Sequence, residues 1–224
     1  MSLLDNDRFR YFLGQRILCE AGTSEKVVAL TFDDGPNPRY TPALLDMLER
    51  KDIPATFFVV GNRVRRFPEI VVRAAGAGHE IANHTWWHIG LTLLPPPEIR
   101  RTIRGTSALI QRTVGVAPRF LRPPMGWFND IVLREIRGTG HTPVIGSIHP
   151  QDSRKPGAGV IVHRVLRRAS PGAIIILHDG GWRIHSDRSQ SVAAADAITD
   201  SLLSQGYRFE TLSNLVENTG TVVP

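Results

Sequence analysis

The sequence predicts a single α/β domain built from about seven βα units, and three observations lead to that prediction. The chain has 224 residues, a length that suits one large α/β or barrel domain. From residue 26 onward, short apolar runs alternate with longer amphipathic segments. No Pro-, Gly- or Ser-rich linker interrupts this alternation. Such units form an open doubly wound sheet or a closed barrel, and in both folds the functional groups lie at the carboxyl ends of the strands.

Each expected strand is a short apolar run that ends in turn-forming or polar residues. The expected strands are residues 27–32, 55–60, 79–82, 119–121, 142–147, 173–177 and 207–211. The expected helices carry apolar residues at spacings of three and four. They are residues 43–51, 68–77, 95–114, 129–137, 159–169 and 192–204. Thr41 and Pro42 are expected to give the first helix its N-cap and its first-turn proline.

One domain is expected over residues 26–217, followed by a short tail over residues 218–224. Residues 1–25 mix charges with aromatic side chains and are expected to form a short helix that packs on the domain. Cys19 is the single cysteine, so no internal disulfide can form.

The composition excludes several classes of protein. A net charge of +6 and a pI near 10.2 would attract anionic partners, but no nucleic-acid-binding motif accompanies them, so no nucleic-acid partner is expected. Basic clusters such as residues 63–66 are expected on solvated helix faces. No run reaches about 18 apolar residues, so no membrane span is expected. The charged N-terminus lacks the apolar segment of a signal peptide, which predicts a cytoplasmic chain, or an envelope or extracellular one if an export segment was removed.

Polar side chains follow the expected strands and suggest a metal site. Asp33 and Asp34 end the first strand, where they fit either an Asx-type turn or a functional site. His84 and His88 are four residues apart, so in a helical turn they would share a face and bind one metal. One of the two aspartates would complete a set of two histidines and one carboxylate, which leaves positions open for water and substrate. The spacing does not decide which aspartate is the ligand.

Such a site could hydrolyse an amide. A bound metal polarises a carbonyl and lowers the pKa of its water toward about 7. The second aspartate could accept the proton, and Arg122 could keep that base ionised through a charge-assisted bond. His178, with an ordinary pKa near 6.5, could protonate a leaving amine. The structural alternatives are an ion pair for Arg122 and a buried strand-end histidine for His178. No glycine-rich fingerprint follows the first strand, so no nucleotide cofactor is expected.

Four motifs resemble, in order and spacing, those of the polysaccharide deacetylases, the family-four carbohydrate esterases. They are TFDDGP at residues 31–36, HTWWH at 84–88, RPPMG at 122–126 and LHD at 177–179. The similarity extends over about residues 26–212 and includes flanking segments such as GHEI at 78–81 and ATFF at 55–58. The resemblance implies a distorted (β/α) barrel of fewer than eight strands.

The resemblance also implies individual roles. Asp33 matches the general base and His178 the general acid, while Arg122 matches the residue that tunes the base. The backbone N–H of Met125 matches a donor that stabilises the oxyanion. The residues that match the metal ligands are Asp34, His84 and His88. The implied metal is zinc or another divalent transition metal, with cobalt, nickel or manganese as alternatives. Asp179 is expected to be structural.

The fourth motif departs from the family pattern, which is commonly Asp-x-x-Asp-Trp. The best match is HPQDS at residues 149–153, in which Asp152 would keep the role of orienting His178. His149 then replaces the first aspartate and Ser153 replaces a groove-lining tryptophan. The substrate-binding wall is therefore expected to differ from that of the family while the chemistry is retained.

The predicted reaction is the removal of N-acetyl groups from N-acetylhexosamine units of a glycan such as peptidoglycan or chitin. Four tryptophans in strand-end loops could stack on sugars, although packing is an equal alternative for each of them. They are Trp86, Trp87, Trp127 and Trp182. Two other functions remain open: hydrolysis of a small non-peptide amide on the same fold, and glycan binding without catalysis. The oligomeric state is not predicted.

Overall fold

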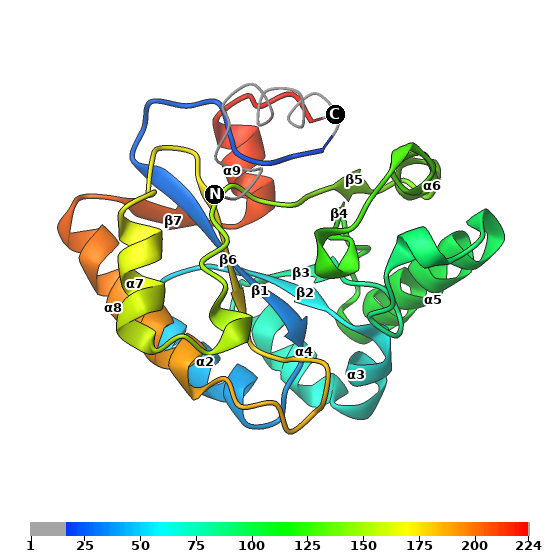
Figure 1. Ribbon diagram of the computed structural model, residues 1–224, viewed down its shortest axis with the longest axis horizontal. Helices are drawn as coiled ribbons and strands as arrows, with labels where there is room; N and C mark the ends of the chain where they lie inside the picture. Colours follow the sequence, from blue (N-terminus) through cyan, green and yellow to red (C-terminus); the bar gives the residue numbers. More distant parts are fainter. Residues whose placement is uncertain (1–16, 224) are drawn as a thin grey trace.

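The structure is a computed structural model that describes residues 17–223. In these residues, seven parallel strands form one curled sheet at the centre of the molecule (Figure 1). The order along the sheet is β5-β4-β3-β2-β1-β6, and β7 pairs with the first part of β1. The strands are β1 (Val27–Gly35), β2 (Thr56–Val59), β3 (Glu80–Asn83), β4 (Phe120–Leu121), β5 (Thr142–Pro143), β6 (Ile174–His178) and β7 (Arg208–Glu210). All seven expected strands are therefore present.

The chain after β5 brings the two ends of the sheet together. Strand β5 ends at Pro143, before the expected 147: Val144 forms only an isolated bridge with Leu18, and the positive φ of 87° at Gly146 then turns the backbone away from an extended path. Ile148 then forms a parallel bridge with Ile175 of β6, the strand at the other end of the path. This crossing curls the sheet into a distorted barrel, so of the two folds that the βα pattern allows, the barrel is the correct one.

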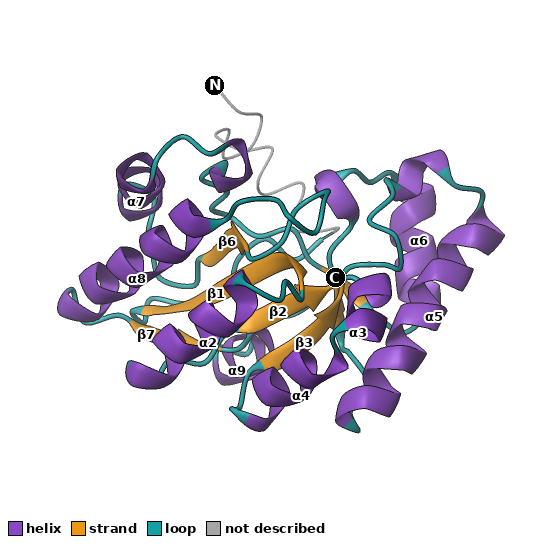
Figure 2. Cartoon of the chain, turned by 90° about the horizontal axis from the view of Figure 1, so that it is seen from below, coloured by secondary structure: helices purple, strands orange, loops and turns teal. Residues whose placement is uncertain are grey.

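Helices cover the outside of the sheet (Figure 2). They are α2 (Tyr40–Arg50), α3 (Gly61–Arg66), α4 (Pro68–Gly76), α5 (Pro96–Val114), α6 (Asp130–Gly138), α7 (Ala158–Leu166), α8 (Ser189–Ser204) and α9 (Leu212–Asn218). The sequence did not predict α3 and α9, which have six and seven residues and are too short to show a helical period.

The expected N-cap at Thr41 is wrong, because α2 begins one residue earlier, at Tyr40. The side-chain oxygen of Asn37 accepts hydrogen bonds from the N–H groups of Arg39 and Tyr40 at 2.9 and 3.1 Å. Thr41 lies inside the first turn, where its hydroxyl donates to a carboxylate oxygen of Asp179 at 2.5 Å. A threonine that pattern reasoning assigned to helix capping thus contacts the residue that follows β6.

Strand β1 is buried on both faces, and its alternation separates two parts of the core. Val28, Leu30 and Phe32 pack in the larger cluster together with α2, α4 and α8. Val27 and Ala29 lie in a second cluster with residues of the neighbouring strands and of α9. Because Thr31 and Asp33 continue the same alternation, β1 directs them to the second face at its carboxyl end.

The beginning of the described chain packs on this domain. Leu18 and Glu20 form isolated bridges with Val144 and Ala173. The helix expected within residues 1–25 falls mostly on residues 1–16, which lie outside the described residues. Among the helices of residues 17–223, none is long and apolar enough to cross a membrane.

Candidate active site

The end of β1 presents two buried aspartates in different directions. Asp33 still belongs to the strand and pairs in register with His178 of the neighbouring strand β6. Asp34 has a positive φ of 75°, which is uncommon for a residue other than glycine and interrupts the alternation of the strand. The two carboxylates therefore reach different partners, although they are adjacent in sequence.

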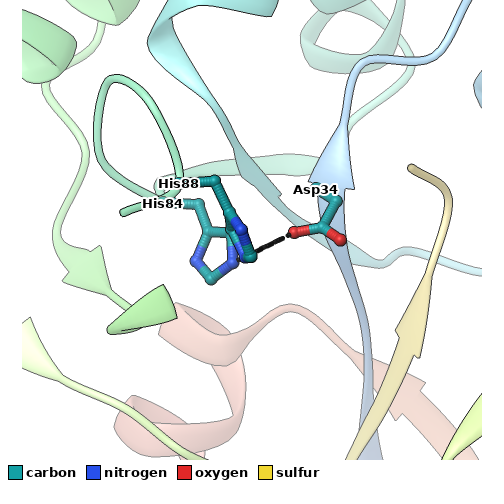
Figure 3. Close-up of side chains that lie close together, drawn as sticks. All are labelled: Asp34, His84 and His88. Atoms are coloured by element: carbon teal, nitrogen blue, oxygen red, sulfur yellow. Dashed lines mark ion pairs between the residues drawn. The ribbon is translucent and has the colours of Figure 1, made fainter. Parts of the chain in front are cut away.

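Asp34 lies beside the two histidines of the loop after β3 (Figure 3). Its Oδ1 is 2.9 Å from Nε2 of His88 and 3.4 Å from Nε2 of His84. The expected helical turn is wrong, because residues 84–88 form no helix. Positive φ angles of 66° at Thr85 and 57° at His88 bend this loop, and the two imidazole rings lie 4.9 Å apart between centroids. The bent loop, rather than a helical turn, therefore brings His84 and His88 together.

The donor atoms of these three residues fit a divalent transition metal. Nδ1 of His84 lies 2.8 Å from the carbonyl oxygen of Arg122 and donates to it, so Nε2, which faces Asp34, is the ring nitrogen left to bind a cation. Oδ1 of Asp34 is buried and has no hydrogen-bond partner within residues 17–223. Burial disfavours the ionised carboxylate, but the two imidazoles outweigh burial and hold the pKa of Asp34 well below its usual range. The ligand atoms all lie within 4.8 Å of one another, a set that one cation would satisfy.

Asp33 is held by a buried arginine. Nη1 of Arg122 donates to Oδ1 of Asp33 at 2.5 Å and to the hydroxyl of Thr31 at 2.9 Å. The guanidinium carbon lies 4.0 Å from the centre of the Phe58 ring, which covers the cation from one side. A charge-assisted bond of this kind is short and fixes the orientation of the carboxylate.

His178 is held by a buried aspartate on the other side of the site. Nδ1 of His178 lies 2.8 Å from Oδ1 of Asp152, whose Oδ2 accepts from the backbone N–H of His178 at 2.8 Å and from the Ser191 hydroxyl at 2.7 Å. Burial disfavours the imidazolium, but Asp152 and, more weakly, Asp34 and Asp33 outweigh burial and raise the pKa of His178 to about 9. His178 is therefore protonated at neutral pH.

Asp33, Asp34, both loop histidines, Arg122 and His178 line one cavity of about 580 Å³. The other residues around it are Met125, Gly126, Phe128, Ile145, Gly146, His149, Ser153, Ile176, Trp182 and Arg188. Met125, the expected oxyanion donor, has a positive φ of 60°. His149 and Ser153, the departures in the fourth motif, both lie on the cavity wall, as does Trp182.

The four tryptophans expected along a substrate groove do not line one cavity. Trp86 and Trp87 line a different cavity, and Trp127 is half-exposed and packs near Gly90 rather than on the catalytic cavity. Trp182 alone among the four lines that cavity, and three quarters of its surface is exposed.

Two buried arginines that the sequence analysis did not select hold the loops around the site. Arg63 donates to the carbonyl oxygens of Asp34 and Gly181, and Arg188 donates to that of Gly180. The expectation that the basic residues of 63–66 lie on a solvated face is therefore wrong for Arg63, which is 9% exposed. Backbone carbonyls accept all of these hydrogen bonds, and because every residue carries one, the pairing leaves no signal in the sequence.

Asp179 lies beneath the site and is fully buried. Burial, together with the nearby Asp34 charge, outweighs its bond to Thr41 and raises the pKa of Asp179 to about 7. A side chain at Gly35 would collide with this carboxyl group, so the glycine of the first motif is a packing requirement.

Comparisons with known proteins agree with this arrangement. A family model described as "Polysaccharide deacetylase" matches residues 20–144. A peptidoglycan-N-acetylglucosamine deacetylase of Bacillus cereus is 41% identical over 199 residues, which cover 88% of this chain and 91% of the relative. A chitooligosaccharide deacetylase of Rhizobium leguminosarum bv. trifolii is 38% identical over 211 residues, covering 91% and 98% of the two chains.

A solved structure shows the same fold. It is a peptidoglycan N-acetylglucosamine deacetylase in complex with 4-naphthalen-1-yl-N-oxidanyl-benzamide, with a TM-score of 0.84 and 34% identity. The superposed region covers 88% of this chain and 91% of that one. From the barrel, the site and these similarities together, the chain belongs to the polysaccharide deacetylases, a family of hydrolases that act on N-acetyl groups.

Proposed function

We propose that this protein removes N-acetyl groups from N-acetylhexosamine residues of a glycan, with a divalent transition metal held by Asp34, His84 and His88. One observation carries the proposal. The three ligand atoms converge within 4.8 Å on the same cavity that an arginine-bound Asp33 and an aspartate-bound His178 line. A cation site, a base and an acid around one cavity are what amide hydrolysis requires.

When bound, the metal supplies Lewis acidity that polarises the acetyl carbonyl and makes a water molecule more acidic. Asp33 accepts a proton from the attacking water, and the ion pair with Arg122 holds that carboxylate in position. The water oxygen forms the new bond to the acetyl carbon. The backbone N–H of Met125 is proposed to donate to the carbonyl oxygen as it gains negative charge.

His178 completes the reaction on the opposite side. Its Nδ1 is bound to Asp152, so Nε2 is the nitrogen that can donate a proton to the leaving amine as the C–N bond breaks. The products are acetate and a free amino sugar. With its pKa raised to about 9, His178 is protonated at neutral pH, as a general acid must be before it acts.

The relatives support a polymeric or oligomeric N-acetylated substrate. Their printed names specify peptidoglycan and chitooligosaccharide deacetylases, and N-acetylglucosamine is common to both kinds of glycan. Trp182 on the cavity wall offers an exposed aromatic face of the kind that stacks on a sugar ring.

An acetate-release assay tests this proposal. The purified protein is loaded in turn with zinc, cobalt, nickel or manganese and incubated with N-acetylglucosamine oligosaccharides and with purified peptidoglycan. We expect acetate from at least one glycan, and we expect a chelator to abolish the release and fresh metal to restore it. If none of the metal-loaded forms releases acetate from any of these glycans, the proposal is wrong.

A further inference from the structure

The loop that carries the two histidines has two functional faces. His84 and His88 line the catalytic cavity, whereas Trp86 and Trp87, which lie between them in sequence, line a second cavity. The positive φ angles at Thr85 and His88 make this division possible, because they reverse the direction in which successive side chains leave the backbone. One strained loop of five residues thus forms part of the wall of two cavities.

The second cavity has a volume of about 480 Å³ and lies between this loop and the first half of α5. Its size falls in the range of small-ligand sites. Its wall consists of Trp86, Trp87, Ile89, Leu94, Glu98, Arg101, Thr102 and Gly105. Trp87 is 55% exposed, which leaves a large aromatic surface in contact with solvent.

The aromatic wall is fixed in place before any ligand binds. The N–H of Trp86 donates to the Thr102 hydroxyl on α5 at 3.0 Å, and the carbonyl of Trp86 accepts from the N–H of Asn62 at 3.0 Å. Arg65 places its guanidinium 5.9 Å from the centre of the Trp86 ring. Trp87 meets this ring edge to face at 6.5 Å. A preformed aromatic surface loses little entropy when a ligand stacks on it.

The two charged side chains that line the cavity pair with each other. Arg101 and Glu98 form an ion pair at 2.7 Å, so the polar groups of the lining add donors and acceptors without net charge. A neutral polyhydroxyl ring can stack on the indoles and exchange hydrogen bonds with this pair, and it needs no counter-charge. The chemistry of the cavity therefore matches an uncharged sugar.

We propose that this second cavity, between residues 85–89 and the first half of α5, is an ancillary binding site for a neutral N-acetylhexosamine unit of a glycan. The inference rests on the proposed function only in that the glycan is taken to be the polymer deacetylated in the catalytic cavity. Because both cavities share one loop, a strand bound at the second site is held at the surface beside the metal ligands. The site would raise the effective concentration of a long or insoluble substrate.

Two variants of the full chain test the ancillary site. Trp87→Ala removes the exposed ring, and Gly105→Leu adds a side chain that projects from α5 toward the Trp86 ring and narrows the cavity. A Cβ at Gly105 would lie 3.7 Å from the Trp86 ring, an ordinary contact, and leucine suits a helix better than glycine. The matched control is Gly76→Leu, the same exchange at the end of α4, where nothing lies within 4 Å.

Two measurements are made on the metal-loaded proteins. The first is the fraction of protein bound to insoluble chitin and to purified peptidoglycan in a sedimentation assay. The second is the ratio of acetate released from the insoluble glycan to acetate released from soluble N-acetylglucosamine disaccharide. For Trp87→Ala and Gly105→Leu we expect binding and the activity ratio to fall by roughly tenfold, with bound metal unchanged by elemental analysis. Gly76→Leu should match the unaltered protein.

The outcomes separate this inference from the proposed function. If both variants bind and deacetylate the insoluble glycan normally, the ancillary site does not exist. The inference is also overturned if polymer and disaccharide activity fall together, because the cavity then acts through the catalytic site. If the unaltered protein releases no acetate at all, the proposed function fails, and the sedimentation assay still decides whether the cavity binds glycan.

Discussion

The two sides of the catalytic cavity are built differently. On one side, Asp34 and the two loop histidines converge, and the buried Oδ1 of Asp34 faces both imidazoles without a hydrogen-bond partner within the described chain. On the other side, Asp152 makes three hydrogen bonds, two of them to His178. The ligand atoms of the first side need a cation as their common partner, whereas the carboxylate of the second side already has its hydrogen-bond partners within the protein. Metal content and proton transfer should therefore respond to separate substitutions.

The largest expected effect comes from exchanging the adjacent aspartates one at a time. Asp34→Asn removes the charge that faces both imidazoles, so we expect loss of bound metal and an activity at least about a thousandfold lower. Asp33→Asn should keep the metal and still lose roughly a hundred- to ten-thousandfold in turnover, because only the base is removed. Elemental analysis and acetate release measure the two effects. Metal loss in Asp33→Asn with retention in Asp34→Asn would reverse the assignment.

Removal of either loop histidine should act as Asp34→Asn does. His88→Ala leaves two of three ligands, and we expect metal content near zero after dialysis and a lower melting temperature in metal-containing buffer, because bound metal stabilises only the folded state. The control is the same comparison in chelator, where the unaltered protein and the variant should melt at closer temperatures. Full metal occupancy of the variant would exclude His88 as a ligand.

The side of the cavity that holds His178 predicts how kcat depends on pH. His178 has a pKa raised to about 9, so kcat should fall as the pH rises through about 9, where the imidazolium loses its proton. Asp152→Asn removes the strongest stabilising charge, although Asp33 and Asp34 remain nearby, and His149 lies 5.8 Å away between ring centroids. The alkaline limb of the kcat profile should therefore move to lower pH. An unchanged limb would show that another group is the acid.

The raised pKa of His178 also predicts how the stability of the fold depends on pH. Because the folded pKa lies above the unfolded value of about 6.5, protonated His178 stabilises the fold fully below about pH 6.5, and this contribution disappears as the pH rises through about 9. In Asp152→Asn the decrease in melting temperature between these pH values should be smaller than in the unaltered protein.

The smallest expected effect concerns the Ser191 hydroxyl, one of the three donors to Asp152. Ser191→Ala should cost about 1 kcal/mol of folding stability, the usual value for a buried hydrogen bond, and should leave metal content unchanged. Chemical denaturation measures the first quantity and elemental analysis the second. A loss of metal would show that the two sides of the cavity are coupled.

Much of the catalytic cavity follows from local sequence, because its residues come directly after parallel strands. The carboxyl ends of such strands meet at one end of a barrel, so Asp33, His84, Arg122 and His178 were expected to lie together, and the structure places them around one cavity. Arg63 and Arg188 could not be selected in this way. Their partners are backbone carbonyls, which any sequence can supply.

The alternation of strands and helices and the four ordered motifs are local properties, so the sequence alone predicted an α/β domain and its resemblance to the deacetylase family, while the crossing of the chain from β5 to β6 showed that the sheet is curled into a barrel. Spacing left open which aspartate faces the histidines; the tertiary structure places Asp34 there, as the resemblance implied, and it also shows which cavity each tryptophan lines. Both depend on backbone turns at Asp34, Thr85 and His88, where positive φ angles redirect adjacent side chains. Such angles are imposed by contacts between segments far apart in the chain, so no pattern within a single segment reveals them.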